Sequence, residues 1–340
     1  MNKIKLSICI GTYNRSEYIC ETLDSILTQN LDCVEIIIVD GASTDDTHLL
    51  LKKYQNNYKN LHYYRLPSKG GFDKDYSIAV NYANGEYCWL FGDDDIVKPG
   101  SIDYILEQLK YKYDSIIVNA EIKNTDMSQL LKNKCINLSH NKIYEKKDFQ
   151  EFFTDTAAHS SFVGSIIIKR SIWNIRNKKI YFGTLLVHVG VLFQSNFQGK
   201  LLTIAKPLVS IRYGNALWTV KSFEISLFIW PKLIWEFTSF PDSAKKIITP
   251  REPWRNIVRL LYFRARGSYS SNEYNKYLSK EFGFFKNLLA YYIARIPGKF
   301  LNIIFYSYFF IFQYFHRNAK SILIDLEKSI YYFGPSHAKT

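Results

Sequence analysis

The sequence predicts an α/β fold in which a mostly parallel sheet carries helices on both faces. Three observations lead to this prediction. The first 120 residues alternate strand-like runs with helix-like segments. One run, Val34–Asp40, is rich in β-branched residues throughout, as expected for a strand that is buried on both faces. Polar residues follow the predicted strands, at the edge where open parallel sheets bind ligands.

The elements are predicted in the order that right-handed crossovers between parallel strands require. Ser16 and then Ser43 or Thr44 are predicted helix N-caps, and Asn84-Gly85 is a predicted helix end. The predicted strands are 5–10, 34–40, 61–66, 87–91 and 115–120. The predicted helices are 16–29, 43–58, 73–83 and one opened by Pro99.

The pattern loosens beyond residue 124. A strand and turn are predicted at 162–173, an apolar helix at 182–194 and a strand at 206–215. After Trp218 the chain is helical in pattern, basic and aromatic. We therefore predict one α/β domain at 1–217 and a helical C-terminal region at 218–340.

Composition allows a substantial core but places the charge unevenly. The chain has 340 residues, 47% of them hydrophobic, and a formal net charge of +13. Residues 251–340 hold 14 Lys and Arg against 5 Asp and Glu, which is +9. The five cysteines form no CxxC pair and are expected to be free thiols of a reducing compartment. No signal peptide and no membrane-spanning run are expected.

The strongest chemical signal is the triplet Asp93, Asp94 and Asp95, which follows the strand predicted at 87–91. Carboxylates that lie close together repel one another and favour a bound cation. Their hard oxygen atoms suit Mg²⁺ or Mn²⁺, which proteins often hold through one or two carboxylates and the phosphates of a substrate. The pattern therefore predicts a metal–diphosphate site. The alternative is a solvated acidic turn before a helix.

Two other predicted strand ends offer groups that suit a nucleotide. Asp40 is placed to accept a hydrogen bond from a nucleobase N–H, Tyr13 to stack on the base, and the backbone near Thr12 to hold the ribose. Arg15 and either Lys69 or Lys74 are candidate phosphate ligands. Each residue has the alternative of an ordinary loop role. No GxGxxG or GxxxxGK[ST] motif supports a Rossmann dinucleotide site or a P-loop.

Together, the segments SICIGTYNRSEYICETLDSILTQ, VEIIIVDGASTDDT and GEYCWLFGDDDIVKPGSI resemble the family-2 glycosyltransferases, which have a Rossmann-like GT-A fold. The resemblance covers residues 4–120. The later segments GSIIIKR, VHVGVLF and PLVSIRYGN are similar to the bacterial abequosyltransferase-like branch, which acts on O-antigen.

This resemblance implies a nucleotide-sugar donor, a divalent metal and single-displacement transfer with inversion. It implies that Asp95 and Asp93 bind the metal, with Asp95 foremost. The residues implied at the nucleotide sugar are Thr12, Tyr13, Asn14, Arg15, Asp40, Ser43, Asp93 and Asp94. To these we add Lys74, as the candidate phosphate ligand named above. The sequence departs from the family pattern at Gly11, where Pro is usual, and at FDKDYSIAV, where Ala-Arg-Asn is common.

Inverting transfer also needs a general base. The family usually supplies an Asp about ninety residues after the triplet, and this chain has His188 there instead. We predict His188 as the base, and its alternatives are a metal ligand or a structural core histidine. Asp155 and His159 are further candidates.

The C-terminal segment 281–317 predicts two helices divided by Pro297-Gly298. They are rich in aromatic and apolar residues and are flanked by Lys286, Arg295, Lys299 and Arg317. Such helices are typical of segments that lie in the headgroup layer of a membrane. The alternative is an ordinary buried helical pair.

We therefore expect a metal-dependent glycosyltransferase on the inner face of the cytoplasmic membrane. Its expected acceptor is a lipid-linked saccharide in the synthesis of O-antigen or capsule. A sugar nucleotidyltransferase, a non-catalytic protein that binds nucleic acid or membrane, and a degenerate transferase are the alternatives. No nucleic-acid motif is found, so a nucleic-acid partner is not expected. The sequence does not predict the oligomeric state.

Overall fold

The computed structural model describes residues 3–215, 221–281, 283–316 and 318–334. The chain forms two compact units that interleave along the sequence. The first unit comprises the residues up to Lys123, Lys132–Arg212 and Phe237–Ile248. The second comprises Asn124–Leu131, Tyr213–Glu236 and the residues from Thr249 onward. The boundary predicted between residues 217 and 218 lies outside the described residues.

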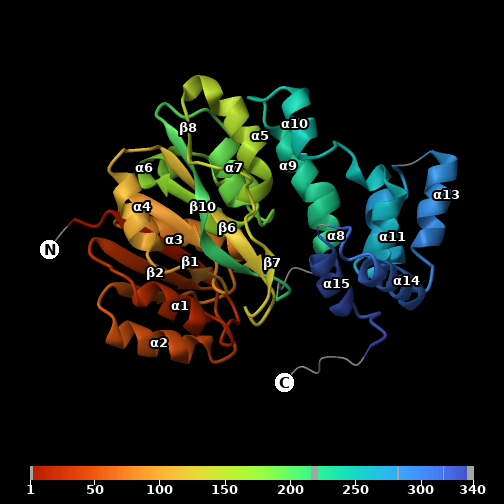
Figure 1. Cartoon of the computed structure of the whole chain (residues 1–340), viewed down its shortest axis with the longest axis horizontal. Helices are drawn as coiled ribbons and strands as arrows, with labels where there is room; N and C mark the ends of the chain where they lie inside the picture. Colours follow the sequence, from red (N-terminus) through yellow and green to blue (C-terminus); the bar gives the residue numbers. More distant parts are fainter. Residues whose placement is uncertain (1–2, 216–220, 282, 317, 335–340) are drawn as a thin grey trace. The chain divides into compact units, whose positions relative to one another are not determined.

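The first unit is built on a ten-stranded sheet (Figure 1). The main path runs in the order β3-β2-β1-β4-β9-β6-β10-β5, while β7 pairs with β6 and β8 with β10. The strands β1, β2, β3 and β4 pair in parallel, as do β6 and β10, whereas β9 is antiparallel to both of its neighbours. The strands are β1 (Leu6–Thr12), β2 (Val34–Asp40), β3 (Leu61–Arg65), β4 (Tyr87–Phe91), β5 (Ile96–Val97), β6 (Ser115–Lys123), β7 (Leu130–Lys132), β8 (Lys142–Tyr144), β9 (Ile166–Lys169) and β10 (Leu201–Arg212).

The helices of the first unit are α1 (Ile19–Leu27), α2 (Thr47–Asn57), α3 (Phe72–Tyr82), α4 (Ser101–Leu109), α5 (Phe149–Ser160), α6 (Arg170–Ile175), α7 (Val187–Phe193) and α10 (Asp242–Ile248). The helix starts predicted at Ser16 and at Ser43 or Thr44 are wrong, because α1 follows Tyr18 and α2 follows Asp46. The helix predicted at 182–194 is confirmed only from Val187 onward. Its first residues include Gly183 at φ 91° and Leu185 at φ 65°, which interrupt helical geometry.

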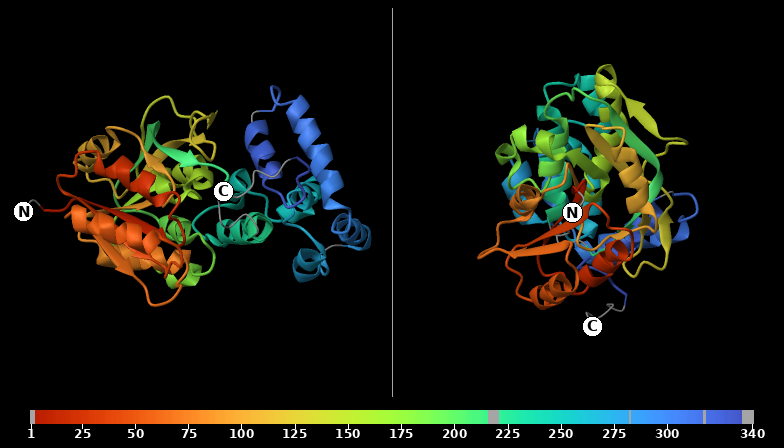
Figure 2. Two further views of the ribbon diagram at one scale, coloured as in Figure 1. Left: turned by 90° about the horizontal axis from the view of Figure 1, so that it is seen from below. Right: turned by 90° about the vertical axis from the view of Figure 1, so that its left-hand side faces the viewer.

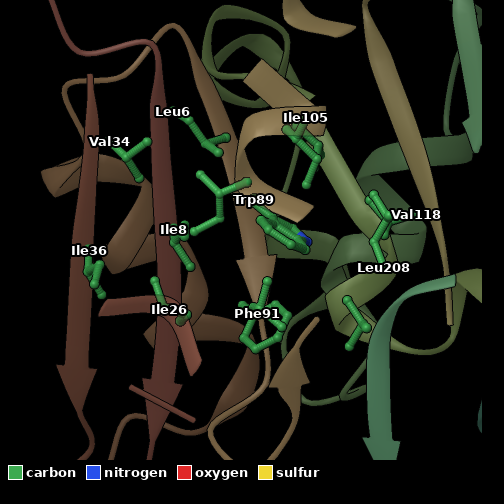
Figure 3. Packing of buried hydrophobic residues seen from close by; sticks show 14 of the residues in the cluster. Leu6, Ile8, Ile26, Val34, Ile36, Trp89, Phe91, Ile105, Val118 and Leu208 are labelled. Carbon is green, nitrogen blue, oxygen red and sulfur yellow. The ribbon is translucent and has the colours of Figure 1, made fainter. Parts of the chain in front are cut away.

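The core of this unit lies along the face of the sheet that carries α1 and α4 (Figure 3). Ile8 is the cross-strand neighbour of both Ile36 on β2 and Trp89 on β4, and all three side chains are fully buried. All seven residues of β2 are buried, as its richness in β-branched residues predicted. Helix α3 contacts β1 and β2 as well.

The second unit is helical. It contains α8 (Ser222–Glu224), α9 (Trp230–Glu236), α11 (Ile257–Ala265), α12 (Ser271–Glu273), α13 (Phe284–Ile293), α14 (Gly298–Ile311) and α15 (Ala319–Glu327). Helix α11 contacts both α13 and α14, and α14 contacts α15, so these helices lie together in each view (Figures 1 and 2). The predicted division at Pro297-Gly298 is confirmed.

Within the described residues, no single helix is long and apolar enough to span a membrane. Residues Phe285–Ile293 and Gly298–Ile311 are long and apolar enough only when taken together, and the chain bends by 90° between these two helices.

Candidate functional site

The ends of β1, β2 and β4 lie at one edge of the sheet, as predicted. Thr12 pairs in register with Asp40, and Ile10 pairs with Phe91 one residue before Gly92. The loops that follow β1 and β2 are then joined by hydrogen bonds. The backbone N–H of Asn14 donates to Ser43 Oγ at 2.9 Å, and the N–H of Thr44 donates to Asn14 Oδ1 at 2.8 Å.

These bonds explain the two wrong helix starts. Ser43 Oγ is engaged by Asn14, and the backbone N–H of Ser16 donates to Asp45 Oδ2 at 3.1 Å. The polar residues that resemble N-caps therefore connect two loops instead. Asn14 has φ 52°, a left-handed conformation that Asn tolerates better than most residues. The loops that follow β1 and β2 are therefore held together beside the ends of these strands.

Asp40 is fully buried and held from three sides. Its Oδ1 accepts from the Ser43 N–H at 2.8 Å and its Oδ2 from the Tyr63 hydroxyl at 2.8 Å, while Arg65 Nε lies 3.8 Å from Oδ2. Burial and the neighbouring Asp40 carboxylate raise the pKa of Tyr63, so its proton stays on the phenol. Carboxylate oxygens each have two lone pairs, which leaves Asp40 able to accept a further N–H.

The Asp triplet follows β4 directly and is paired with Arg15 from the β1 loop. Arg15 Nε lies 3.3 Å from Asp93 Oδ1, and its Nη2 lies 3.2 Å from Asp94 Oδ2. Burial raises the pKa of Asp93 to about 7, and the charge of Asp94 adds to this, although Arg15 opposes it. The Arg15 guanidinium therefore offsets only part of the rise in the pKa of Asp93.

Asp95 lies deeper than Asp93, and β10 holds it in place. Its Oδ1 accepts from the backbone N–H of Arg212 at 2.9 Å, and the Arg212 side chain donates to the Asp94 carbonyl and pairs with Glu21. Burial, followed by the charge of Asp94, raises the pKa of Asp95 well above its ordinary value. A Cβ on Gly92 would lie 2.4 Å from Asp95 Oδ2, so this position needs glycine for the carboxylate to fit.

The triplet fits a divalent cation that is shared with a ligand. Buried carboxylates with raised pKa values gain stability when a cation neutralises them. Among the described residues, no three or more His, Cys, Asp or Glu side chains gather as a complete ligand set. A cation here would therefore draw part of its coordination from substrate phosphates, as Mg²⁺ usually does.

The remaining residues predicted at the nucleotide differ in position. Thr12 is buried at the end of β1. The Lys69 ammonium lies 3.5 Å from the centroid of the Tyr13 ring, so Lys69 lies against the loop that carries Tyr13. Lys74 is exposed on the first turn of α3. Of the two lysines that the sequence offered for phosphate, Lys69 is the one with a contact to the predicted nucleotide loop.

His188 is 1% exposed on α7. Its Nε2 lies 3.3 Å from the carbonyl oxygen of Ser161, its ring packs edge-on against Phe72, and its Nδ1 has no hydrogen-bond partner among the described residues. Burial lowers the pKa of His188 to about 4, so the ring is neutral at pH 7. These surroundings suit the structural alternative, and the base role stays a prediction.

The side chains of the two further base candidates also have hydrogen-bond partners. Asp155 Oδ2 accepts from Lys142 Nζ and from the Tyr144 hydroxyl, both at 2.7 Å. His159 Nε2 lies 2.9 Å from the Val118 carbonyl oxygen, and burial lowers its pKa to about 4.

Asp73 has a positioning role that sequence reasoning missed. Its Oδ2 accepts from the N–H groups of Gly183 and Leu185 at 2.8 and 2.9 Å, and its Oδ1 accepts from Val187 at 3.0 Å. Asp73 thus fixes the loop that enters α7. A partner 110 residues away gives no local signal in the sequence.

The two departures from the family pattern, Gly11 and the stretch FDKDYSIAV, lie against each other in the structure. Tyr76, within FDKDYSIAV, is buried and donates to the Phe91 carbonyl at 2.7 Å. A Cβ on Gly11 would lie 3.3 Å from Tyr76 Cε2 and 3.4 Å from Asp75 Cβ. Gly11 therefore leaves room for the Tyr76 ring beneath the end of β1.

Comparison with known proteins places the chain in a family. Residues 7–176 match Glycosyl transferase family 2. The chain is 32% identical to abequosyltransferase RfbV of Salmonella typhimurium over 272 residues, which is 73% of this chain and 81% of that protein.

Two solved structures share the fold. Staphylococcus aureus TarS 1-349 in complex with UDP has a TM-score of 0.58 at 15% identity, covering 95% of this chain and 90% of that one. Mannosyltransferase PcManGT from Pyrobaculum calidifontis, in complex with GDP-Man and Mn²⁺, has a TM-score of 0.54 at 14% identity, covering 94% and 85%.

These likenesses confirm the GT-A fold and the resemblance inferred from the three N-terminal segments. They give no support to a sugar nucleotidyltransferase or to a non-catalytic binding protein. The chain belongs to glycosyl transferase family 2, and its enzyme class is glycosyltransferase.

Proposed function

We propose that the strand-end site binds a nucleotide-sugar donor together with a divalent cation and transfers the sugar with inversion. The observation that carries this proposal is that the ends of β1, β2 and β4 lie together at one edge of the sheet. Asp40 is buried beside the Asn14–Ser43 loop pair, and the triplet, in which burial raises the pKa of Asp93, lies at the same edge of the sheet. Asp40 complements a nucleobase and the loop pair complements a ribose. The triplet, through a cation, complements a diphosphate.

Asp93 and Asp95 would hold Mg²⁺ or Mn²⁺, with Asp94 beside them. When bound, the cation stabilises the negative charge that develops on the leaving diphosphate. Arg15 already lies within 3.3 Å of Asp93 and 3.2 Å of Asp94, so it is placed to bind a phosphate oxygen when a cation takes over the carboxylates. Asp40 accepts a base N–H, and Tyr63 and Ser43 keep its carboxylate in position.

For the acceptor we propose a lipid-linked saccharide in bacterial surface polysaccharide synthesis. The similarity to an abequosyltransferase over 81% of that protein supports this proposal. We further propose peripheral binding at the inner face of the cytoplasmic membrane through an aromatic surface on α13 and α14. That surface consists of exposed Phe285, Leu289, Tyr292, Phe300, Ile304, Phe310 and Ile311.

Charge at the edge of the aromatic surface supports the same proposal. Lys286 and Lys299 are exposed near it, and the Arg295 guanidinium lies 3.4 Å from the centroid of the Tyr291 ring. Apolar side chains flanked by cations suit a surface that carries anionic headgroups. The fourth cation predicted there, Arg317, lies outside the described residues.

A screen of nucleotide sugars tests the proposed function. Purified full-length protein is mixed with Mn²⁺ and each nucleotide sugar, and both binding and slow hydrolysis of the donor are measured. We expect at least one donor to bind only with the metal present and to release its nucleoside diphosphate. Asp93→Asn is expected to lose the metal-dependent binding and hydrolysis of that donor. Metal-independent binding of every donor, or hydrolysis that survives in Asp93→Asn, would contradict the proposal.

A further inference from the structure

Asp75 occupies a space that Gly41 and Gly70 leave open. It lies in the first turn of α3 and is 4% exposed. A Cβ on Gly41 would lie 2.9 Å from Asp75 Oδ2, and a Cβ on Gly70 would lie 2.7 Å from Asp75 Oδ1. A Cβ on Gly11, in β1, would lie 3.4 Å from the Asp75 Cβ, which is an ordinary van der Waals contact. Glycines from two separate loops therefore admit this one carboxyl group.

This carboxyl group is costly to keep. Asp75 Oδ1 has no hydrogen-bond partner among the described residues, although it is buried. Burial raises the pKa of Asp75 to about 6, with a further contribution from the Asp40 charge, while Lys69 acts in the opposite direction. A buried polar atom without a partner normally costs stability. Its neighbour Asp73, on the same turn, has three backbone donors, so the lack of a partner is specific to Asp75.

The neighbours of Asp75 belong to the proposed base pocket. Its charge interacts with Asp40, the proposed base-recognising acid, and with Lys69, which covers the Tyr13 ring. Gly41 follows Asp40 directly, and its N–H donates to the Thr12 carbonyl at 2.9 Å. Asp75 therefore adds a second carboxyl group to the end of the site where the nucleobase is proposed to lie.

We propose that Asp75, together with Asp40, selects donors whose nucleobase carries an exocyclic amino group. This inference rests on the proposed function. The pairing edge of uracil presents one N–H between two carbonyl oxygens, and a carboxylate facing either carbonyl is repelled. An exocyclic amino group, as in cytosine, guanine or adenine, supplies additional N–H donors for a second acid. The unpartnered Asp75 oxygen is then satisfied only when the correct donor binds.

The test compares nucleoside diphosphates on the full-length protein. Titration calorimetry with Mn²⁺ measures the affinities of CDP, GDP, ADP and UDP for the wild type, Asp75→Asn and Asp103→Asn. Asp103 is an exposed carboxylate on α4 and serves as the matched control. One charged hydrogen bond corresponds to roughly a 10- to 100-fold change in affinity. We expect the wild type to bind an amino-bearing diphosphate about 10-fold or more tightly than UDP.

In Asp75→Asn this preference should fall by about 10-fold while UDP affinity changes by less than about threefold. Asp103→Asn should behave as wild type. A wild-type preference for UDP overturns the inference without any variant, and so does an equal loss of all four affinities in Asp75→Asn. Circular dichroism and thermal melting show whether that variant is folded. If none of the four diphosphates binds, the proposed function fails and the inference fails with it.

Discussion

Replacing Asp75 by Asn should make the protein more stable at neutral pH. The pKa of Asp75 is raised from 3.8 to about 6, a shift of roughly two units. At about 1.4 kcal/mol per unit, forcing this group to ionise in the folded protein costs about 3 kcal/mol. Asn has nearly the same shape and carries no charge, so the Asn variant avoids this cost.

The sign of the pH dependence follows from the direction of the shift. Below the unfolded-state pKa near 3.8, Asp75 is protonated in both states, and the cost is absent. Between the unfolded-state pKa of 3.8 and the folded-state pKa of about 6, the unfolded chain releases the Asp75 proton while the folded protein keeps it, so wild-type stability falls and then levels off above about pH 6. The difference between Asp75→Asn and wild type should therefore be close to zero near pH 4 and largest above pH 7.

Urea denaturation followed by tryptophan fluorescence at pH 4.5, 6 and 7.5 measures this difference. Comparing the two proteins at each pH cancels the contribution of Asp93 and Asp95, whose pKa values are also raised. A variant that is less stable than wild type at pH 7.5, or a difference that does not shrink on acidification, would refute the reasoning.

Three further predictions concern other parts of the molecule. Asp73→Asn should destabilise the protein by about 1–3 kcal/mol in urea, because three backbone N–H groups lose an ionised acceptor; unchanged stability would contradict this role. His188→Ala should lower the turnover number by about 100-fold with donor affinity intact if His188 is the base, whereas near wild-type turnover would leave it a structural residue. Phe300→Glu with Ile304→Glu should weaken sedimentation with anionic liposomes by about 10-fold or more. Ile175→Glu, which replaces an exposed apolar residue of the first unit, should not, and equal effects would refute the aromatic surface.

The strands were predictable because burial on both faces leaves a strong composition signal. Val34–Asp40 and Tyr87–Phe91 are confirmed to the residue, and their polar ends identify the edge of the sheet where the site lies. Helix starts were less predictable. Ser16 and Ser43 carry groups that suit either an N-cap or a bond between loops, and only the three-dimensional register selects the second role.

The roles of Asp73 and Asp75 on α3 could not have been predicted from the local sequence pattern. Asp73 and Asp75 are two residues apart and similar in burial. Asp73 nevertheless fixes a loop 110 residues away, whereas the Oδ1 atom of Asp75 has no hydrogen-bond partner among the described residues. The substitution at Gly11 likewise has its reason in Tyr76, which is distant in sequence and close in space. Such pairs leave no periodic signal, because neither residue alone departs from ordinary usage.

Binding of Mn²⁺ in the presence and absence of a nucleoside diphosphate tests the central claim most directly. Electron paramagnetic resonance titration reports free Mn²⁺ for the wild type and for Asp95→Asn, with folding checked by thermal melting. The account predicts weak Mn²⁺ binding alone, binding at least about 10-fold tighter with the diphosphate, and loss of that gain in Asp95→Asn. Mn²⁺ binding that ignores both the diphosphate and the loss of the Asp95 carboxylate would contradict it.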